Sequence, residues 1–276
     1  MLAARNLAKA WLLLVGFSAA FAALGWAVGG YRFGSLFLFC ALLTAGGLAF
    51  YADRVALGMV GARELPLAEA PGVHSTVERL ALLAGVPKPR LYVLPDPYPR
   101  ALSAGRGARG AAIAVSHGLV GLLTPAELEG VLAHEVAKIA NRDVTVQTPA
   151  VVLAAMVIET SRIGGWLERA LLFVLGPIAA SFLHLLLTYK REYAADRVAA
   201  GLCGSPHGLA DALIRLEQTE ELFEFAASPA TEPLYTVNPF AEQGLAALFV
   251  THPSVATRVQ RLRALDPSWR DKLKAA

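Results

Sequence analysis

One short stretch of this chain combines residue types that bind and activate a metal ion. It reads His134-Glu135-Val136-Ala137-Lys138. On a helix, residues four positions apart share a face, and in an HExxH motif two histidines at that spacing bind zinc while the glutamate acts as general base. The fifth position here is lysine, so the stretch has the pattern of a zinc hydrolase without one of its two imidazole ligands.

A second pair of residues could complete such a site. A catalytic zinc ion takes three protein ligands and keeps a fourth position open for water. Glu192 and Asp196 are also four apart and would share a helical face. We expect Glu192 to be a further ligand and Asp196 to hold the other ring nitrogen of His134, which fixes its tautomer. Without this pair, His134 and Glu135 would be ordinary surface residues of an amphipathic helix.

Lys138 leaves three interpretations open. A lysine binds metal only after losing its proton, and for an ordinary lysine with a pKa of ~10.4 this costs roughly 4.6 kcal/mol at pH 7. Lys138 could still bind a weakly held zinc, or it could stay protonated and pair with Glu192, Glu135 or both, in an inactive site. The cost of deprotonation favours the second interpretation. The third is that the lysine was introduced on purpose to inactivate the chain.

The composition is that of a membrane protein. Of the 276 residues 55% are hydrophobic and 17% are charged, against about 25% charged in soluble domains. The mean hydropathy is +0.49. The net charge is +3 without a dense block of lysine and arginine, which argues against nucleic-acid binding. Cys40 and Cys203 are the only cysteines, and Cys40 lies in an apolar stretch, so a disulfide framework is not expected.

Four stretches are candidates for crossing a membrane. Residues 10–28 and 34–52 carry no charge, have the length that spans a ~30 Å hydrocarbon core, and should form a helical hairpin. The alternative for the first is a cleaved signal peptide. Residues 170–188 are a third candidate, interrupted by His184, and residues 145–158 are a weaker fourth. We expect two membrane hairpins.

Basic residues gather on one side of such an arrangement. They are Arg5, Lys9, Arg54, Arg63, Lys190 and Arg191, against Arg32, Arg162 and Arg169 on the other side. Cytoplasmic loops of membrane proteins carry the excess of lysine and arginine. Both chain ends and the polar domain are therefore expected in the cytoplasm.

The polar parts of the chain carry clear signals for secondary structure. Apolar spacing predicts a helix over residues 71–83, and short apolar runs predict strands over 91–94 and 111–115. Between those strands, the small and glycine-rich residues 101–110 suit a turn or an open sheet edge.

The helix that carries the metal motif has a marked beginning. Thr124 suits the N-cap, Pro125 the first helical position, and Glu127 can close a capping box. We expect this helix to run to about residue 141 and to present residues 134–138 on rigid backbone. Further helices are predicted over 187–202, 206–225 and 251–265, with an irregular stretch over 226–250.

Taken in order, several segments resemble the HtpX family of membrane zinc metalloproteases, relatives of the CAAX prenyl endopeptidases. They are residues 127–129, 131–135, 141–143, 191–197 and 251–253, together with Arg258. The resemblance covers nearly the whole chain, and an ordered set of this kind is far more specific than a bare HExxH.

The resemblance implies a zinc-dependent endopeptidase that cleaves membrane or misfolded proteins. One zinc would be bound by His134 and Glu192, and Glu135 would take a proton from a metal-activated water. Arg258 or His252 would help to stabilise the oxyanion. The implied partners are membrane lipid and polypeptide substrates, with no nucleic acid.

The resemblance also implies a surface for substrate. Family members present an edge strand that pairs with the substrate backbone by β-augmentation. The matching residues here are Leu102, Ser103, Ala104 and Gly105. Arg100 stands where family members usually have asparagine, which puts details of substrate binding in doubt.

These inferences define an expected architecture. It is a mainly α integral membrane protein with about four transmembrane helices in two hairpins, and a cytoplasmic zincin-like α+β protease domain with a small sheet. The expected boundaries are a membrane hairpin over 1–52, a first half of the protease domain over 53–143, a second hairpin over 144–188 and a second half over 189–276. The expected location is the inner or plasma membrane, with several spans and the active site facing the cytoplasm.

Overall fold

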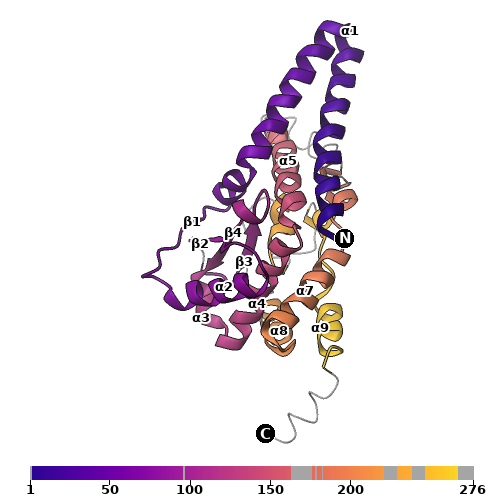
Figure 1. The fold of residues 1–276 in the computed structure, drawn as a ribbon. Helices are drawn as coiled ribbons and strands as arrows, with labels where there is room; N and C mark the ends of the chain where they lie inside the picture. Colours follow the sequence, from indigo (N-terminus) through magenta and orange to yellow (C-terminus); the bar gives the residue numbers. More distant parts are fainter. Residues whose placement is uncertain are drawn as a thin grey trace, which may run out of the picture.

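A long helical hairpin projects from a body made of helices and one small sheet (Figure 1). This arrangement comes from a computed structural model of the chain. The structure describes residues 2–95, 97–162, 176–177, 179–181, 183–220, 229–237 and 246–266.

The projecting hairpin is α1, Leu2–Met59, which folds back on itself. Its turn lies at Gly29 (φ −151°, ψ 28°) and Gly30 (φ 70°, ψ −158°), where the backbone leaves helical geometry. The positive φ of Gly30 favours glycine because residues with a side chain rarely adopt this backbone conformation. The predicted turn between the two apolar stretches is confirmed.

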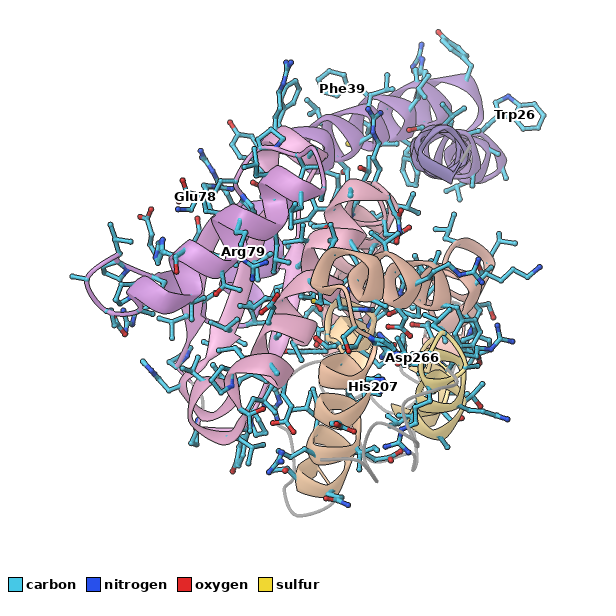
Figure 2. The ribbon with its side chains drawn as sticks, turned by 60° about the horizontal axis from the view of Figure 1, so that its bottom comes forward. Trp26, Phe39, Glu78, Arg79, His207 and Asp266 are labelled. Atoms are coloured by element: carbon cyan, nitrogen blue, oxygen red, sulfur yellow. The ribbon has the colours of Figure 1, made fainter. Side chains whose placement is uncertain are left out.

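The outer surface of the hairpin suits contact with lipid. Residues Gly25–Leu48 are long and apolar enough to cross a membrane, and only 11% of the most apolar part is buried. Trp26 and Phe39 are 66% and 60% exposed and point away from the body of the protein (Figure 2). Within the described part of the chain this is the one stretch that is both long and apolar enough, so four crossings are not confirmed.

The expected second hairpin is described only in part. α5, Val144–Arg162, covers the expected span 145–158, but its apolar part, Val144–Glu159, is shorter than a full span. α5 packs against α1, and Val151 on it is fully buried. Residues 170–175, 178 and 182 of the expected span 170–188 lie outside the described residues. A membrane crossing by these segments remains a prediction.

The sheet is mixed and has the strand order β1-β2-β4-β3. Its strands are β1 (Arg63–Glu64), β2 (Arg90–Leu94), β3 (Ala101–Ala104) and β4 (Ala112–Ser116). β2 and β4 run parallel, and the other two pairs are antiparallel. The two predicted strands are confirmed as β2 and β4, and the small-residue stretch between them forms the edge strand β3. β1 was not predicted, because two residues are too few to show an alternating pattern.

Helices surround the sheet and the motif. They are α2 (Pro71–Leu83), α3 (His117–Leu122), α4 (Pro125–Ala140), α7 (Lys190–Cys203), α8 (His207–Glu220) and α9 (Val255–Arg263), with short 3₁₀ turns η1 (Ala108–Gly110), η3 (Pro229–Leu234) and η4 (Ala246–Phe249). The helices predicted from the sequence are confirmed within one to a few residues, apart from α3, which was not predicted. The residues 221–228 at the end of one predicted helix lie outside the described part.

α4 is the central helix of the body. Thr124 and Glu127 form the predicted capping box at its start. Along Gly130–Ile139 every residue is buried, as in a helix covered on all sides. Gly130 permits a close crossing with α8, because a Cβ there would lie 2.5 Å from the backbone nitrogen of Leu209.

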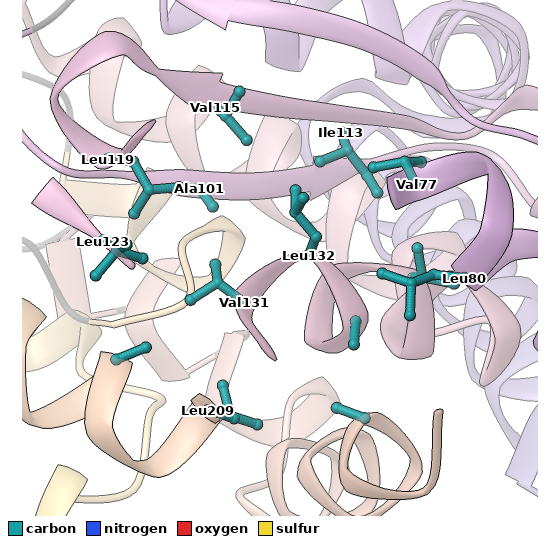
Figure 3. Packing of buried hydrophobic residues seen from close by; sticks show 14 of the residues in the cluster. Val77, Leu80, Ala101, Ile113, Val115, Leu119, Leu123, Val131, Leu132 and Leu209 are labelled. Atoms are coloured by element: carbon teal, nitrogen blue, oxygen red, sulfur yellow. The ribbon is translucent and has the colours of Figure 1, made fainter. Parts of the chain in front are cut away.

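Apolar packing fixes the rotation of α4. Val131 and Leu132 lie between Ile113 of the sheet and Leu209 of α8 (Figure 3), and all of these side chains are within 1% of full burial. Fully burying a side chain of this size contributes about 1.5–3 kcal/mol. A rotation of α4 would therefore be costly, and the polar residues of its motif are held toward α7.

Candidate metal centre and active site

The imidazole of His134 on α4 contacts two carboxylates of α7. Its Nδ1 lies 2.9 Å from Oδ1 of Asp196, and its Nε2 lies 3.3 Å from Oε2 of Glu192. The ring of His134 is fully buried, and the two carboxylates come from one face of α7, as the four-residue spacing predicted. The structure thus brings together the three residues that the sequence grouped.

Arg258 of α9 locks Asp196 in place. Its Nε and Nη2 donate to the two carboxylate oxygens of Asp196 at 2.9 and 2.7 Å. Its Nη1 donates to the carbonyl of Thr236 at 2.5 Å. All three guanidinium nitrogens are used in this way inside the protein. Arg258 therefore holds Asp196 and, through it, the ring of His134.

Burial and ion pairing oppose each other in this cluster. Burial pushes the pKa of His134 down, but the neighbouring carboxylates of Asp196 and Glu192 outweigh burial and raise that pKa above its usual value. Burial pushes the pKa of Asp196 up, but the charge of Arg258 outweighs it and lowers the pKa. For Glu192, burial is outweighed by the charges of His252 and Arg191, and its pKa falls well below the usual value. Both carboxylates stay ionised, the form that can bind a cation.

Several polar atoms on one side of the cluster are buried without a hydrogen-bond partner. They are Nε2 of His134, both carboxylate oxygens of Glu192, Oε2 of Glu135 and Nε2 of His252. Buried polar groups are nearly always satisfied in folded proteins, so such a concentration calls for a reason. A cation bound between them would give these atoms partners.

Glu135 and Lys138 face the irregular segment that follows α8. Oε1 of Glu135 accepts a hydrogen bond of 2.8 Å from the hydroxyl of Thr236. Nζ of Lys138 donates to the carbonyl of Leu234 at 3.0 Å and lies 3.5 Å from Oε2 of Glu135. Of the two carboxylates expected to pair with Lys138, Glu135 is the one that forms an ion pair.

His252 enters the cluster from the loop before α9. Its Nδ1 lies 2.8 Å from Oε1 of Glu232, and its Nε2 lies 3.8 Å from Oε1 of Glu192. Glu232 is fixed by the backbone N–H and hydroxyl of Thr251, at 3.0 and 2.7 Å. The sequence analysis missed Glu232 because it stands alone in an irregular segment, where no periodicity marks a buried face.

The edge strand β3 has a neighbour on its open side. Leu102 pairs with Tyr235 in an antiparallel bridge, and the backbone N–H of Thr236 donates to the carbonyl of Ala101 at 3.1 Å. The N–H of Gly105 donates to the hydroxyl of Thr148 on α5 at 2.9 Å. Of the expected substrate-binding residues, Leu102, Ser103 and Ala104 lie on this edge and are fully buried. Arg100, just before the strand, stacks over the ring of Tyr98 at 5.0 Å.

Among the described residues, no three His, Cys, Asp or Glu side chains lie close enough together, as placed, to hold a metal ion. The donor types nevertheless fit zinc, which takes imidazole nitrogen and carboxylate oxygen at about 2.0–2.2 Å. Two such ligands of a tetrahedral ion lie roughly 3.3 Å apart. Nε2 of His134 and Oε2 of Glu192 have that separation, at 3.3 Å.

Comparison with known proteins identifies the relatives of this chain. Residues 67–266 match the model of peptidase family M48. The chain is 37% identical to a protease HtpX homolog of Pelotomaculum thermopropionicum, over 94% of this chain and 99% of that protein. It is 40% identical to a protease HtpX homolog of Persephonella marina, over 77% of this chain and 81% of that protein.

A solved structure has a similar fold. The crystal structure of Ste24p from S. mikatae matches with a TM-score of 0.50 at 20% sequence identity. The match covers 87% of this chain and 63% of the Ste24p chain. At that identity the likeness concerns the fold alone.

Proposed function

The chain belongs to peptidase family M48, and on that premise we propose that it is a zinc-dependent membrane endopeptidase of HtpX type. One observation carries the proposal. Nε2 of His134 and Oε2 of Glu192 face each other at 3.3 Å, fully buried and without hydrogen-bond partners. A nitrogen and an oxygen that bind the same metal ion need no hydrogen bond from the protein, because the ion is their partner. The substrates would be membrane or misfolded proteins.

The proposal assigns the metal to His134 and Glu192. When bound, zinc would lower the pKa of a water molecule and polarise the scissile carbonyl. Asp196 accepts from Nδ1–H of His134, so the lone pair of the neutral ring lies on Nε2, on the side of Glu192. Arg258 is a positioning residue in this scheme, because its nitrogens are already used by Asp196 and Thr236. We therefore do not retain it as a group that stabilises the oxyanion.

Glu135 would move the proton. Its Oε1 is occupied by the hydroxyl of Thr236, whereas its Oε2 is buried without a hydrogen-bond partner. Oε2 is therefore the atom that would accept the proton of the attacking water and later pass it to the leaving amine. The ammonium of Lys138 lies 3.5 Å from the same oxygen.

The substrate would bind as an extended strand beside β3. The bridge between Leu102 and Tyr235 illustrates how a backbone pairs with that edge in antiparallel fashion. A substrate must either displace the segment that contains Tyr235 or pair beyond it. The exposed apolar hairpin α1 would hold this site at a membrane, with several crossings and the cytoplasmic orientation that the basic residues predict.

A second candidate function rests on Lys138. Its ion pair with Glu135 and its hydrogen bond to Leu234 give the buried ammonium of Lys138 partners without a metal. A chain of this kind would bind client proteins without cleaving them. In that case client binding should survive Glu135→Ala, and no proteolysis should be measurable in the unmodified chain.

The two candidates are separated by one experiment on the purified full chain in detergent. Casein cleavage is followed after dialysis against a chelator and again after zinc is added back. The peptidase predicts cleavage that the chelator removes and zinc restores. Intact casein under all of these conditions, with casein still bound, would contradict the peptidase and favour the client-binding protein.

A further inference from the structure

The motif of this chain leaves a proposed zinc short of one ligand. His134 and Glu192 supply two, and catalytic zinc sites in proteins use three. Lys138 stands at the fifth motif position. Its ammonium donates to the carbonyl of Leu234 and forms an ion pair with Glu135. A third ligand must therefore come from another part of the chain.

We propose that His252 is this third zinc ligand and takes the place of the histidine that the motif lacks. The inference rests on the proposed function, since it concerns the same metal. The three ligands would come from α4, from α7 and from the loop before α9, instead of two from α4. His252 thus becomes a ligand, where the sequence pointed only to support of the oxyanion.

The free ring nitrogen of His252 is the first observation behind this assignment. Nε2 is buried and has no hydrogen-bond partner. It lies 3.8 Å from Oε1 of Glu192, which is too long for a hydrogen bond. Oε1 of Glu192 also lacks a hydrogen-bond partner. Nε2 of His134 lies 3.3 Å from the other oxygen of the same carboxylate. Glu192 is thus flanked on both sides by imidazole nitrogens without partners.

The other ring nitrogen supplies the second observation. Nδ1 of His252 lies 2.8 Å from Oε1 of Glu232, whose carboxylate is held by the N–H and hydroxyl of Thr251. Metal-binding histidines almost always donate their second N–H to a carboxylate, a carbonyl or water, which orients the ring. His134 has the same arrangement with Asp196 at 2.9 Å. Both rings are therefore oriented by a carboxylate, with Nε2 left for a ligand.

An ordinary buried ion pair explains these contacts less well. In that arrangement Glu192 would accept hydrogen bonds from its histidine neighbours, whereas both of its oxygens lack one and only Nε of Arg191 lies near Oε1, at 3.4 Å. A metal needs only a modest closure, from the observed 3.8 Å between Glu192 and His252 toward the roughly 3.3 Å between ligands of a tetrahedral ion.

The test measures zinc binding by the full chain in detergent, by elemental analysis and by competition with a coloured chelator. His252→Ala should weaken zinc binding by about 100-fold or more, beyond the ~10–100-fold lost with an outer partner. Lys138→Ala should retain zinc. His207→Ala is the matched control, because His207 also pairs with a carboxylate, Asp266 at 3.1 Å, but lies outside the cluster. It should retain zinc as well.

A second measurement needs no variant. X-ray absorption of the zinc-loaded, unmodified chain counts imidazole ligands, and the proposal predicts two. His252→Gly offers a further check, since added imidazole should restore its zinc binding. One imidazole ligand in the spectrum, or full zinc affinity in His252→Ala, overturns this inference and leaves the proposed function standing. An unmodified chain that binds no zinc overturns both.

Discussion

The two sides of the buried cluster differ in how far their polar atoms are satisfied. On the side of α7, Nε2 of His134, Nε2 of His252 and both oxygens of Glu192 have no hydrogen-bond partner. On the other side, Lys138 donates to the carbonyl of Leu234, and Oε1 of Glu135 accepts from Thr236. The backs of both imidazoles are nevertheless held firmly, by Asp196 and Glu232.

This difference indicates which side of the cluster could bind a metal ion. A buried polar group without a partner costs about 1–3 kcal/mol, so the side of α7 is costly unless something binds there. The side of Lys138 is largely satisfied by the chain itself. Lys138, at the fifth motif position, thus contacts other parts of the chain, while the two imidazoles lie beside the carboxylate of Glu192.

The largest effect is expected at Glu135. Glu135→Gln should lower casein cleavage by about 10²–10⁴-fold, because an amide cannot accept the proton at Oε2. Zinc content should stay unchanged, since the proposed ligands are other residues. Cleavage near the unmodified rate would remove Glu135 from the mechanism. Loss of zinc in this variant would instead make Glu135 part of the metal site.

The next effect concerns stability. Asp196→Ala should lower the free energy of unfolding by about 3–5 kcal/mol, because it leaves the buried charge of Arg258 without its partner. Asp211→Ala is the control, since Asp211 also pairs with an arginine, Arg263 at 3.3 Å, but is 55% exposed. It should cost no more than about 1 kcal/mol. Denaturant titration in detergent compares the two, and equal losses would contradict the buried network.

A smaller loss is expected at Thr236. Thr236→Val removes the hydroxyl that donates to Glu135 and should cost about 1.5–3 kcal/mol, the range for a hydrogen bond to a charged group. Thr219→Val is the matched control, because the hydroxyl of Thr219 bonds to the carbonyl of Arg215 on an exposed part of α8. The same titration should show almost no change there. A loss at Thr219 as large as that at Thr236 would refute the special role of the buried hydroxyl.

The smallest effect is a gain. Lys138→His should raise casein cleavage by about tenfold, the scale of change seen when groups around a metal are altered. The substitution removes the ammonium from Glu135 and adds an imidazole on the face of His134. Initial cleavage rates with saturating zinc provide the measurement. No gain would show that Lys138 does not limit the reaction.

Local chemistry explains what could be predicted from the sequence. The capping box of Thr124 and Glu127 defines the start of α4 within four residues, so α4 was predicted closely. The spacing of Glu192 and Asp196 likewise follows from helical geometry alone. The small residues before β4 indicated an edge strand, and the structure confirms β3 there.

Contacts between distant segments explain what could not be predicted. Thr236 meets Glu135 and Lys138 meets Leu234 across about a hundred positions of the chain, from a segment without periodicity. The role of Glu232 is to hold the ring of His252, which lies in a different irregular stretch. No pattern within either stretch encodes such a pairing. The replacement of a motif ligand by His252 could therefore not be inferred before the fold was known.

The central claim is that the cluster holds a metal despite Lys138. The most direct test is the zinc content of the purified, unmodified chain after dialysis against metal-free buffer. The account predicts about one zinc per chain, held by two imidazoles and one carboxylate. A folded chain, shown by cooperative unfolding, that contains no zinc would contradict this prediction. The ion pairs within the cluster would then take the place of the metal.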